Sequence, residues 1–281
     1  MSQKSYDGSN ALYLIPTPIG NLEDITLRAI NTLKKVDVIF CEDTRIAGML
    51  LSKLEIKKRF ISCNNINEEQ VKEKVLLELK NGLNVGLITD RGTPIISDPG
   101  YKSVEFIIKN GYNVIGLPGP TALIPALITS GIEPSPFLFY GFLNSKITKM
   151  EKELEELKNN KCTLIFYEAP HRLLNTLSVF KKILGDRRIS VSREISKLYE
   201  EIYRGKISDV IKEISEDVKG EFVIVVEGNK EVVDYNDISI KAHIVSYVNL
   251  GYSEKEAMKF VARDRKMSKS DVYKEYLKGR D

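Results

Sequence analysis

The sequence predicts an α/β protein with two α/β sub-domains and a small helical bundle at its carboxyl end. Short apolar runs rich in β-branched residues alternate with amphipathic stretches along most of the 281-residue chain. This alternation is typical of βαβ units around a mostly parallel sheet. Charged and Pro-containing sequence interrupts the alternation at 133–161, and the segment 237–281 contains helical patterns alone.

The segment 11–132 is expected to form the first α/β sub-domain, after a polar tail at 1–10. Val71, Val75 and Leu79 recur every four residues, which places them on one face of a helix. Strands are predicted at 11–15, 36–41, 59–63, 85–89 and 112–117, and helices at 24–35, 44–53, 67–80, 101–110 and 120–130.

The second α/β sub-domain is expected at 162–232, after a linker and a charged helix at 133–161. Because 199–205 has the pattern of one arm of a hairpin, we expect a mixed sheet here. An aromatic extended segment is predicted at 137–143, strands at 162–167, 188–192, 200–203 and 222–226, and helices after Pro170 and at 208–218.

The segment 237–281 is expected to form three short helices, at 238–249, 253–264 and 268–278. Two of them begin with the spacing of a capping box, from Ser253 and from Ser268. Ten Lys and Arg against seven Asp and Glu give this segment the whole formal net charge of the chain, +3. Its proportions resemble a helix-turn-helix unit, and the basic bias favours a polyanion-binding role over a purely structural one.

Composition and missing motifs exclude several functions. Three distant cysteines and two histidines predict neither a disulfide framework nor a metal site, so we expect a reducing cytoplasm and no bound metal. No apolar run approaches the ~20 residues of a membrane span, and the polar first ten residues contain no signal core. The chain also lacks Gly-x-Gly-x-x-Gly, a P-loop and Gly-x-Ser-x-Gly, which argues against dinucleotide, NTP and serine-hydrolase chemistry.

Polar residues with Gly and Pro gather in the loops that follow the predicted strands. Ligands of open α/β sheets bind at the carboxyl ends of strands, where these loops meet. Together they offer backbone amides, hydroxyls and carbonyls, which suit a zwitterionic, adenine-bearing ligand held without metal. The loops are 16–21, 41–45, 89–100, 117–121, 168–172 and 193–197.

Seven motifs, six at these loops and one around the strand predicted at 222–226, resemble the tetrapyrrole methylase superfamily, and within it the group that methylates small-subunit ribosomal RNA. They are LIPTPIGN at 14–21, CEDTR at 41–45, GTPIISDPG at 92–100, LPGPT at 117–121, LIFYEAPHRL at 164–173, REISK at 193–197 and GEFVIVVEG at 220–228. The resemblance implies two α/β sub-domains of tetrapyrrole-methylase type with a cofactor cleft between them. It also implies 2'-O-ribose methylation of a cytidine in 16S rRNA from S-adenosylmethionine, usually by a homodimer.

The resemblance also implies the residues that hold the cofactor. Asp98 is expected to face the α-amino group, although it and Ser97 could instead cap the helix that follows. Phe166 could instead be a core residue of its strand. The implied cofactor residues are Pro16, Asp90, Gly92, Thr93, Pro94, Ser97, Asp98, Pro120, Thr121, Phe166, Tyr167 and Ala169.

One position departs from the family pattern. The Asp-Ala-Gly that usually precedes Thr-Pro is Asp90-Arg91-Gly92 in this chain. Arg91 could point outward, reach RNA or crowd the cofactor, and we expect it to point outward. The opening of a helix at Pro120 and Thr121 would place backbone amides beside a carboxylate.

Methyl transfer depends mainly on alignment, and removal of the hydroxyl proton could add ~10²–10⁴-fold. Candidate bases are Glu194, Lys197 and His171, the last at a helix start whose dipole favours neutral imidazole. RNA phosphates could bind to Arg45, Arg172 and Arg193, each of which could equally form a surface ion pair.

Two other functions stay open from the sequence. A methylase acting on a tetrapyrrole would have a small anionic substrate and no need of a basic tail. A non-catalytic RNA- or ribosome-binding protein could have kept the fold, and cofactor binding would distinguish it.

Overall fold

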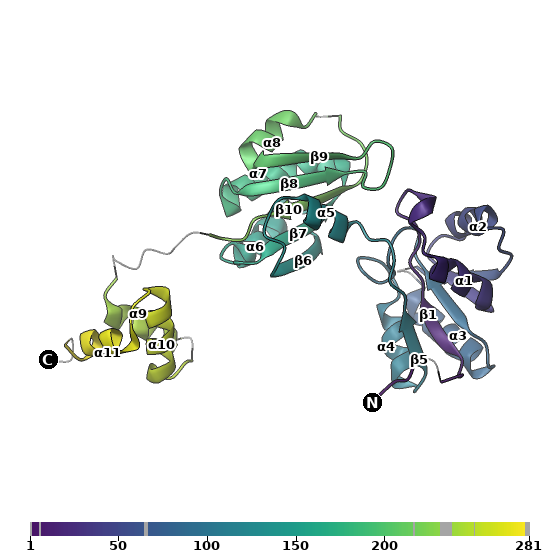
Figure 1. The fold of residues 1–281 in the computed structure, drawn as a ribbon, viewed down its shortest axis with the longest axis horizontal. Coiled ribbons are helices and arrows are strands. Elements are labelled where there is room, and N and C mark those ends of the chain that lie inside the picture. The colour runs from purple at the N-terminus through teal and green to yellow at the C-terminus, as the bar shows by residue number, and fades with distance from the viewer. Residues whose placement is uncertain are drawn as a thin grey trace. The chain divides into compact units, whose positions relative to one another are not determined.

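The computed structural model describes residues 2–5, 7–64, 67–215, 217–230, 238–249 and 251–278. Contacts divide the chain into two compact units, Met1–Asn229 and Lys230–Asp281, which we call the α/β unit and the helical unit. The α/β unit contains two five-stranded sheets, and the helical unit contains three helices in its described part (Figure 1). The expected α/β class and the helical carboxyl end are confirmed.

The first sheet is parallel throughout, with the strand order β3-β2-β4-β1-β5. Helices cover both of its faces, which is why its three inner strands, β2, β4 and β1, are apolar along their whole length. Tyr13 and Ile39 pack toward α1 and α2, while Leu12 and Phe40 pack toward α3 and α4. The elements are β1 (Ala11–Leu14), η1 (Leu22–Asp24), α1 (Leu27–Lys35), β2 (Val38–Cys41), α2 (Thr44–Lys53), β3 (Arg59–Ser62), α3 (Glu68–Lys80), β4 (Val85–Ile88), α4 (Tyr101–Lys109) and β5 (Asn113–Gly116).

The second sheet is mixed, as expected, with the order β6-β7-β10-β8-β9. β6 runs parallel to β7, and the remaining neighbours are antiparallel, including the β8–β9 hairpin. The elements are α5 (Leu123–Thr129), β6 (Phe137–Phe142), α6 (Ile147–Leu157), β7 (Thr163–Glu168), η2 (Pro170–Arg172), α7 (Leu173–Leu184), β8 (Arg188–Arg193), β9 (Glu201–Lys206), α8 (Ile207–Glu213) and β10 (Phe222–Val226).

The boundary between the two sub-domains differs from the expected one. The segment 133–161, expected as a linker and a helix, supplies β6 and α6 to the second sub-domain. The helix α5 also belongs there, because Ala126 and Leu127 pack against Val223 and Val225 of β10. The chain therefore passes to the second sub-domain just after β5.

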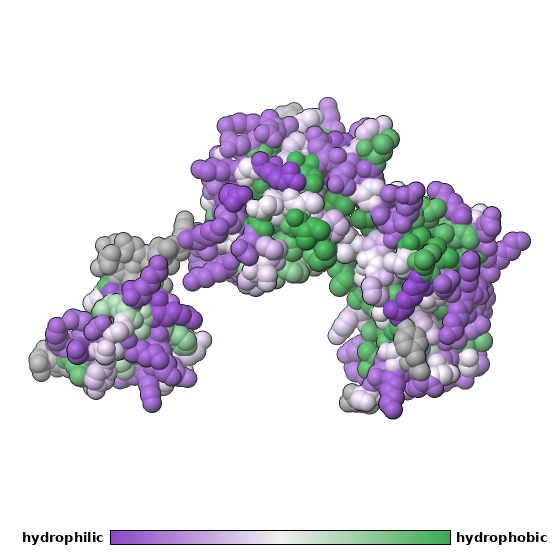
Figure 2. Space-filling model, viewed as in Figure 1, coloured by the Kyte–Doolittle hydropathy of each residue, from purple (hydrophilic) through white to green (hydrophobic). Residues whose placement is uncertain are grey.

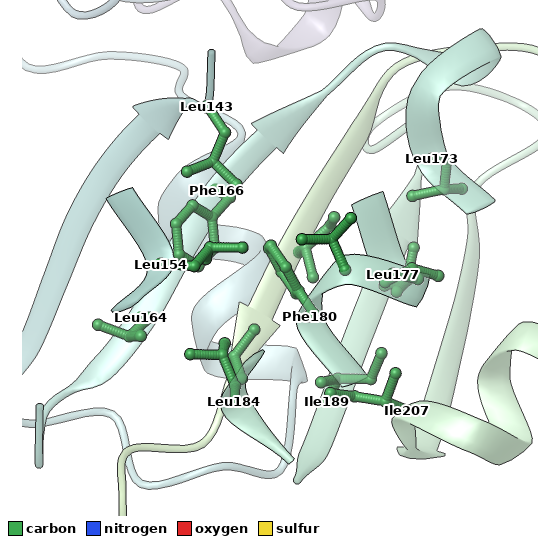
Figure 3. Close-up of a cluster of buried hydrophobic side chains, with 14 of the residues drawn as sticks. Leu143, Leu154, Leu164, Phe166, Leu173, Leu177, Phe180, Leu184, Ile189 and Ile207 are labelled. Atoms are coloured by element: carbon green, nitrogen blue, oxygen red, sulfur yellow. The ribbon is translucent and has the colours of Figure 1, made fainter. Parts of the chain in front are cut away.

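A large apolar cluster fills the other face of the second sheet, under α6, α7 and α8. Phe166 and Phe180 point toward one another in this cluster (Figure 3), with ring centroids 4.9 Å apart. The two faces of the sheet are thus packed independently, and the face that carries α5 is the one nearest the first sub-domain's loops.

The helical unit is built from α9 (Ile240–Asn249), α10 (Glu254–Asp264) and α11 (Lys269–Lys278). The predicted capping box begins α10, since Ser253 accepts from the Glu256 N–H and Glu256 accepts from the Ser253 N–H. A small core surrounds Ile244 and Val261, and the visible face of this unit is mainly hydrophilic (Figure 2). No helix in the described ranges is long and apolar enough to cross a membrane.

Candidate active site

A cavity of about 330 Å³ lies where the two sub-domains of the α/β unit meet. The first sub-domain contributes the loop after β4, and the second contributes the ends of β7 and β8 and the start of β10. The location agrees with the rule that ligands bind at the carboxyl ends of parallel strands. The lining residues are Ile19, Arg91, Gly92, Thr93, Ile96, Ser97, Asp98, Thr121, Ala122, Phe142, Tyr167, Glu168, Ala169, Pro170, Ile195, Gly220, Glu221, Phe222 and Val223.

Hydrogen bonds connect three loops of the first sub-domain behind the cavity wall. Thr17 and Gly92 exchange backbone N–H···O bonds of 2.9 and 3.1 Å. The Thr93 hydroxyl donates to the Pro120 carbonyl at 2.9 Å. Gly92 has a φ of +81°, and a Cβ there would lie 3.3 Å from Ile19. Glycine is therefore needed at 92 both for its backbone conformation and for the close approach of the first loop.

The loop after β4 is held in an unusual conformation. Ile95 and Ser97 both have positive φ, at 80° and 69°, and this region is unfavourable for a β-branched residue such as Ile95. Such residues cost of order 1–3 kcal/mol and cluster at functional sites. The buried carboxylate of Glu68 accepts from the N–H groups of Gly100 and Lys102 at 2.9 and 3.0 Å, which fixes the far end of the loop.

Ser97 and Asp98 do not cap α4, which was the alternative to their cofactor role. The N-cap of α4 is Gly100, and no side-chain cap bond is present there. Both residues line the cavity instead. Burial, followed by the charges of Glu42 and Asp90, raises the pKa of Asp98 to about 7. This end of the cavity therefore favours a cationic ligand group.

Aromatic and hydroxyl groups form another part of the wall. Tyr167 makes edge-to-face contacts with Phe139 and Phe142, at 4.9 and 5.6 Å between centroids. Burial raises the pKa of Tyr167, and hydrogen bonds from the Thr121 side chain and the Leu123 backbone oppose that effect. This wall is suited to a flat, partly apolar group.

Several residues implied to touch the cofactor do not reach the cavity. The prediction that Phe166 contacts the cofactor is wrong, and the alternative of a core residue holds: its side chain is 1% exposed and belongs to the core on the opposite face of its strand. Pro16 packs against Gly119, since a Cβ added at Gly119 would lie 2.5 Å from the Cβ of Pro16. Asp90 accepts from the Asp43 N–H at 3.0 Å. Pro94 and Pro120 are absent from the lining set, and α5 begins at Leu123 instead of Pro120.

A cluster of charged side chains lies beside the cavity. The Lys197 ammonium donates to Glu194 Oε1 at 2.8 Å and to Glu221 Oε2 at 2.9 Å. Glu221 also pairs with Arg91 of the first sub-domain. Burial raises the pKa of Glu194, but the bonds from Lys197 and from the Glu221 N–H, with the charge of Arg91, outweigh it and lower the pKa overall.

The other residues predicted for chemistry or RNA binding lie elsewhere. His171 is exposed in η2 and is not among the lining residues. Arg172 donates to the Leu143 carbonyl at 2.9 Å and pairs with buried Glu168. Arg193 donates to the Lys219 carbonyl at 2.7 Å. Arg45 is 87% exposed and pairs with Asp43, so it is the most accessible of the three arginines.

Sequence reasoning missed the participation of Glu221 and its ion pair with Arg91. Arg91 was expected to point outward and its side chain is 53% exposed. It also borders the cavity and forms an ion pair with Glu221, 130 residues away. The signal for Glu221 was its position directly before an apolar strand, in the motif at 220–228. That position did not reveal its partners.

Comparison with known proteins defines the class. The family Tetrapyrrole (Corrin/Porphyrin) Methylases matches residues 11–211, and the chain belongs to that family. Solved structures share the fold: uroporphyrin-III-C-methyltransferase from Thermus thermophilus has a TM-score of 0.56 at 18% identity, covering 78% of this chain and 94% of that chain. The methyltransferase CobJ has a TM-score of 0.60 at 16% identity, covering 78% and 95%.

Within the family, the chain is similar along almost its whole length to proteins named ribosomal RNA small subunit methyltransferase I. The Bacillus subtilis protein is 48% identical, over 98% of this chain and 97% of its own. The Halalkalibacterium halodurans protein is 43% identical, over 98% of each. The resemblance drawn from the seven motifs is confirmed.

Proposed function

We propose that this chain transfers a methyl group from S-adenosylmethionine to the 2'-hydroxyl of a cytidine in 16S rRNA of the small ribosomal subunit. The observation that carries the proposal is the identity of 43–48% to two proteins of that name across almost the whole chain. The helical unit is included in that similarity, so the relationship extends beyond the shared methylase fold.

The residues at the cavity fit this cofactor. Asp98, with Glu42 and Asp90 nearby, would face its cationic amino group. Tyr167, Ala169 and the apolar wall would hold its adenosine part. The proposed contacts are Gly92, Thr93, Ser97, Asp98, Thr121, Tyr167 and Ala169, all of which line the cavity.

Bound S-adenosylmethionine would supply a methyl group on a positively charged sulfur. The hydroxyl oxygen would gain the C–O bond, the sulfur would keep the electron pair of the broken C–S bond, and the amine form of Lys197 would accept the hydroxyl proton. We assign the proton acceptor to Lys197, because it lies beside the cavity and its nitrogen is already held by Glu194 and Glu221. Glu194 holds Lys197. Its lowered pKa makes Glu194 a weak base, so we assign it a holding role.

We propose small-subunit rRNA as the partner, contacted in part by the basic helical unit and by Arg45. A homodimer is the proposed assembly, as the family resemblance implies. The proposed location is the cytoplasm, where its ribosomal substrate is made.

Incubation of the protein with labelled S-adenosylmethionine and undermethylated small subunits tests the proposal. Nucleoside analysis should recover label in 2'-O-methylcytidine. If label appeared in free rRNA or in a tetrapyrrole added in parallel, and none in subunits, the labelled molecule would be the substrate in place of the small subunit. Calorimetry with the demethylated cofactor should detect one site per chain, and no binding would favour a non-catalytic role.

A further inference from the structure

Glu221 is the point at which the two sub-domains and the Lys197 side chain meet. Its Oε2 accepts from the Lys197 ammonium at 2.9 Å, and its Oε1 pairs with Arg91. Its backbone N–H donates to Glu194 Oε1 at 2.9 Å. One residue thus binds an ammonium, a guanidinium and the second carboxylate of the same cluster.

The Lys197 side chain is confined along its length. It lies so close to Gly20 that a Cβ there would be 2.3 Å from Lys197 Cγ. Its side chain is 19% exposed. Glu194 and Glu221 account for two of its three N–H donors, so the direction of the third donor is determined by the first two.

Glu194 is fixed in its turn by its surroundings. Its backbone has a φ of 50°, and its side chain occupies the space beside Gly220, where a Cβ would lie 2.6 Å from Glu194 Cγ. Glu221 has no such enclosure, because its side chain is 59% exposed. The Glu221 carboxylate is therefore restrained by its two cationic partners, Lys197 and Arg91.

We propose that Glu221 is a positioning residue, which aligns the Lys197 ammonium at the cavity and is itself aligned by Arg91. The inference rests on the proposed function, in which Lys197 acts at the ribose hydroxyl. Arg91 lies next to Gly92 and Thr93 in the cofactor loop, so this ion pair connects the loop that holds the cofactor to the residue that meets the substrate.

The charges around Lys197 come from three segments. Glu194 lies on its own loop, Glu221 lies before β10, and Arg91 lies after β4. Asp24 reaches the same loop through Ser196, and the adjoining Gly20 contributes no charge. Glu221→Gln removes one negative charge from beside the ammonium while preserving the shape of the side chain.

Single-turnover methylation of small subunits at saturating cofactor tests the proposal. We expect Glu221→Gln to lower the rate at least tenfold at neutral pH, with the apparent KM for subunits and the Kd for the demethylated cofactor within threefold of wild type.

Arg91→Gln should lower the rate less, by about threefold to tenfold, and Arg91→Lys should restore most of it. The double variant should be no slower than Glu221→Gln, because both changes act through one contact. Glu151→Gln is the matched control, since it removes a carboxylate that pairs with Lys182 at 2.7 Å on the same sub-domain, far from the proposed chemistry.

A Glu221→Gln rate within threefold of wild type would overturn the proposal, as would a change in KM alone or a failure of Arg91→Lys to restore the rate lost in Arg91→Gln. If wild-type protein itself fails to methylate subunits, the proposed function is overturned and this inference with it. An active wild type with an equally active Glu221→Gln variant overturns only the role of Glu221.

Discussion

Glu68 and Gly100 are joined by a hydrogen bond of 2.9 Å, in which a buried carboxylate at the start of α3 accepts the N–H at the start of α4. The same oxygen accepts from Lys102. The carboxylate thereby takes the place of a local cap, and it holds the end of the strained loop that carries Ser97 and Asp98.

Replacement of Glu68 by Ala should loosen this loop. The two N–H groups would lose a charged acceptor, at a cost of about 2 kcal/mol in unfolding free energy. Affinity for the demethylated cofactor should fall about tenfold, or ~1.4 kcal/mol. Glu68→Gln keeps an acceptor oxygen and should lose less of both. Urea unfolding measures the loss of stability, and calorimetry measures the loss of affinity. An unchanged affinity in Glu68→Ala would show that the hydrogen bonds to Glu68 do not support cofactor binding.

Cofactor affinity should depend on the ionisation of Asp98. Its pKa is raised to about 7 in the folded protein. Below that pH the carboxyl is mainly neutral and provides no countercharge for the ammonium group of the cofactor. Affinity should rise by up to tenfold per pH unit toward pH 7 and then level off. Calorimetry from pH 5.5 to 8.5 measures the dependence. Asp98→Asn should flatten it, and an equally steep curve in that variant would assign the effect to another group.

The same shift has the opposite effect on the ligand-free protein. The Asp98 carboxyl titrates near 3.8 in the absence of the fold, so its raised pKa favours the folded state at low pH. That contribution is fully present below about pH 4 and is lost as pH rises through 7. The thermal stabilisation produced by bound cofactor should therefore grow as pH rises.

The elements and the general location of the site could be predicted because they depend on local patterns. Apolar periodicity placed the strands and helices to within a few residues. Because ligands of α/β sheets bind at the carboxyl ends of strands, the loop at 89–100 was predicted as part of the site. The same periodicity could have excluded one error: successive strand residues face opposite sides. Since Tyr167 faces the cavity, Phe166 must face away from it.

The partners of the charged residues could not be predicted in this way. Arg172 and Arg193 are of a residue type that commonly binds phosphate. Both nevertheless donate to backbone carbonyls of distant segments. Glu221 and Arg91 meet across 130 residues. A sequence pattern states which charges are present, whereas the packing of the two sub-domains decides which of them meet.

The assignment of Lys197 to the hydroxyl can be tested against Glu194 in one assay. Lys197→Ala should lower the single-turnover rate more than tenfold, which corresponds to more than ~1.4 kcal/mol, with substrate affinity nearly intact. Glu194→Gln keeps the shape and a weaker acceptor, so its loss should be smaller. A larger loss in Glu194→Gln would reverse the two roles. If affinity alone fell in Lys197→Ala, Lys197 would be a phosphate ligand.

Gly20→Ala should disturb Lys197 without altering any charge. The new Cβ would lie 2.3 Å from Lys197 Cγ, so the flexible lysine stem must move. We expect a rate loss close to that of Lys197→Ala. Gly82→Ala is the control, because Gly82 also has a positive φ, but a Cβ at that position would have no neighbouring atom within 4 Å among the described residues. Both variants should lose about 1 kcal/mol of stability, and a normal rate in Gly20→Ala would show that the lysine position is not critical.

The basic helical unit should contribute to RNA binding through one face of α10. Lys255, Lys259 and Arg263 are exposed and spaced four residues apart, so they lie along one side of the helix. Replacing all three by Gln leaves the core around Val261 and the Ser253 cap intact. Phosphate binding releases counterions, so the triple variant should bind small subunits more weakly and with a shallower salt dependence, by up to one unit of slope for each phosphate that is no longer neutralised. Affinity for the cofactor should be unchanged, because its proposed residues lie in the α/β unit.

A triple Gln variant at Lys241, Lys269 and Lys274 provides a charge-matched comparison. Equal weakening in both variants would indicate a general charge effect, and undiminished binding in both would return the helical unit to a structural role.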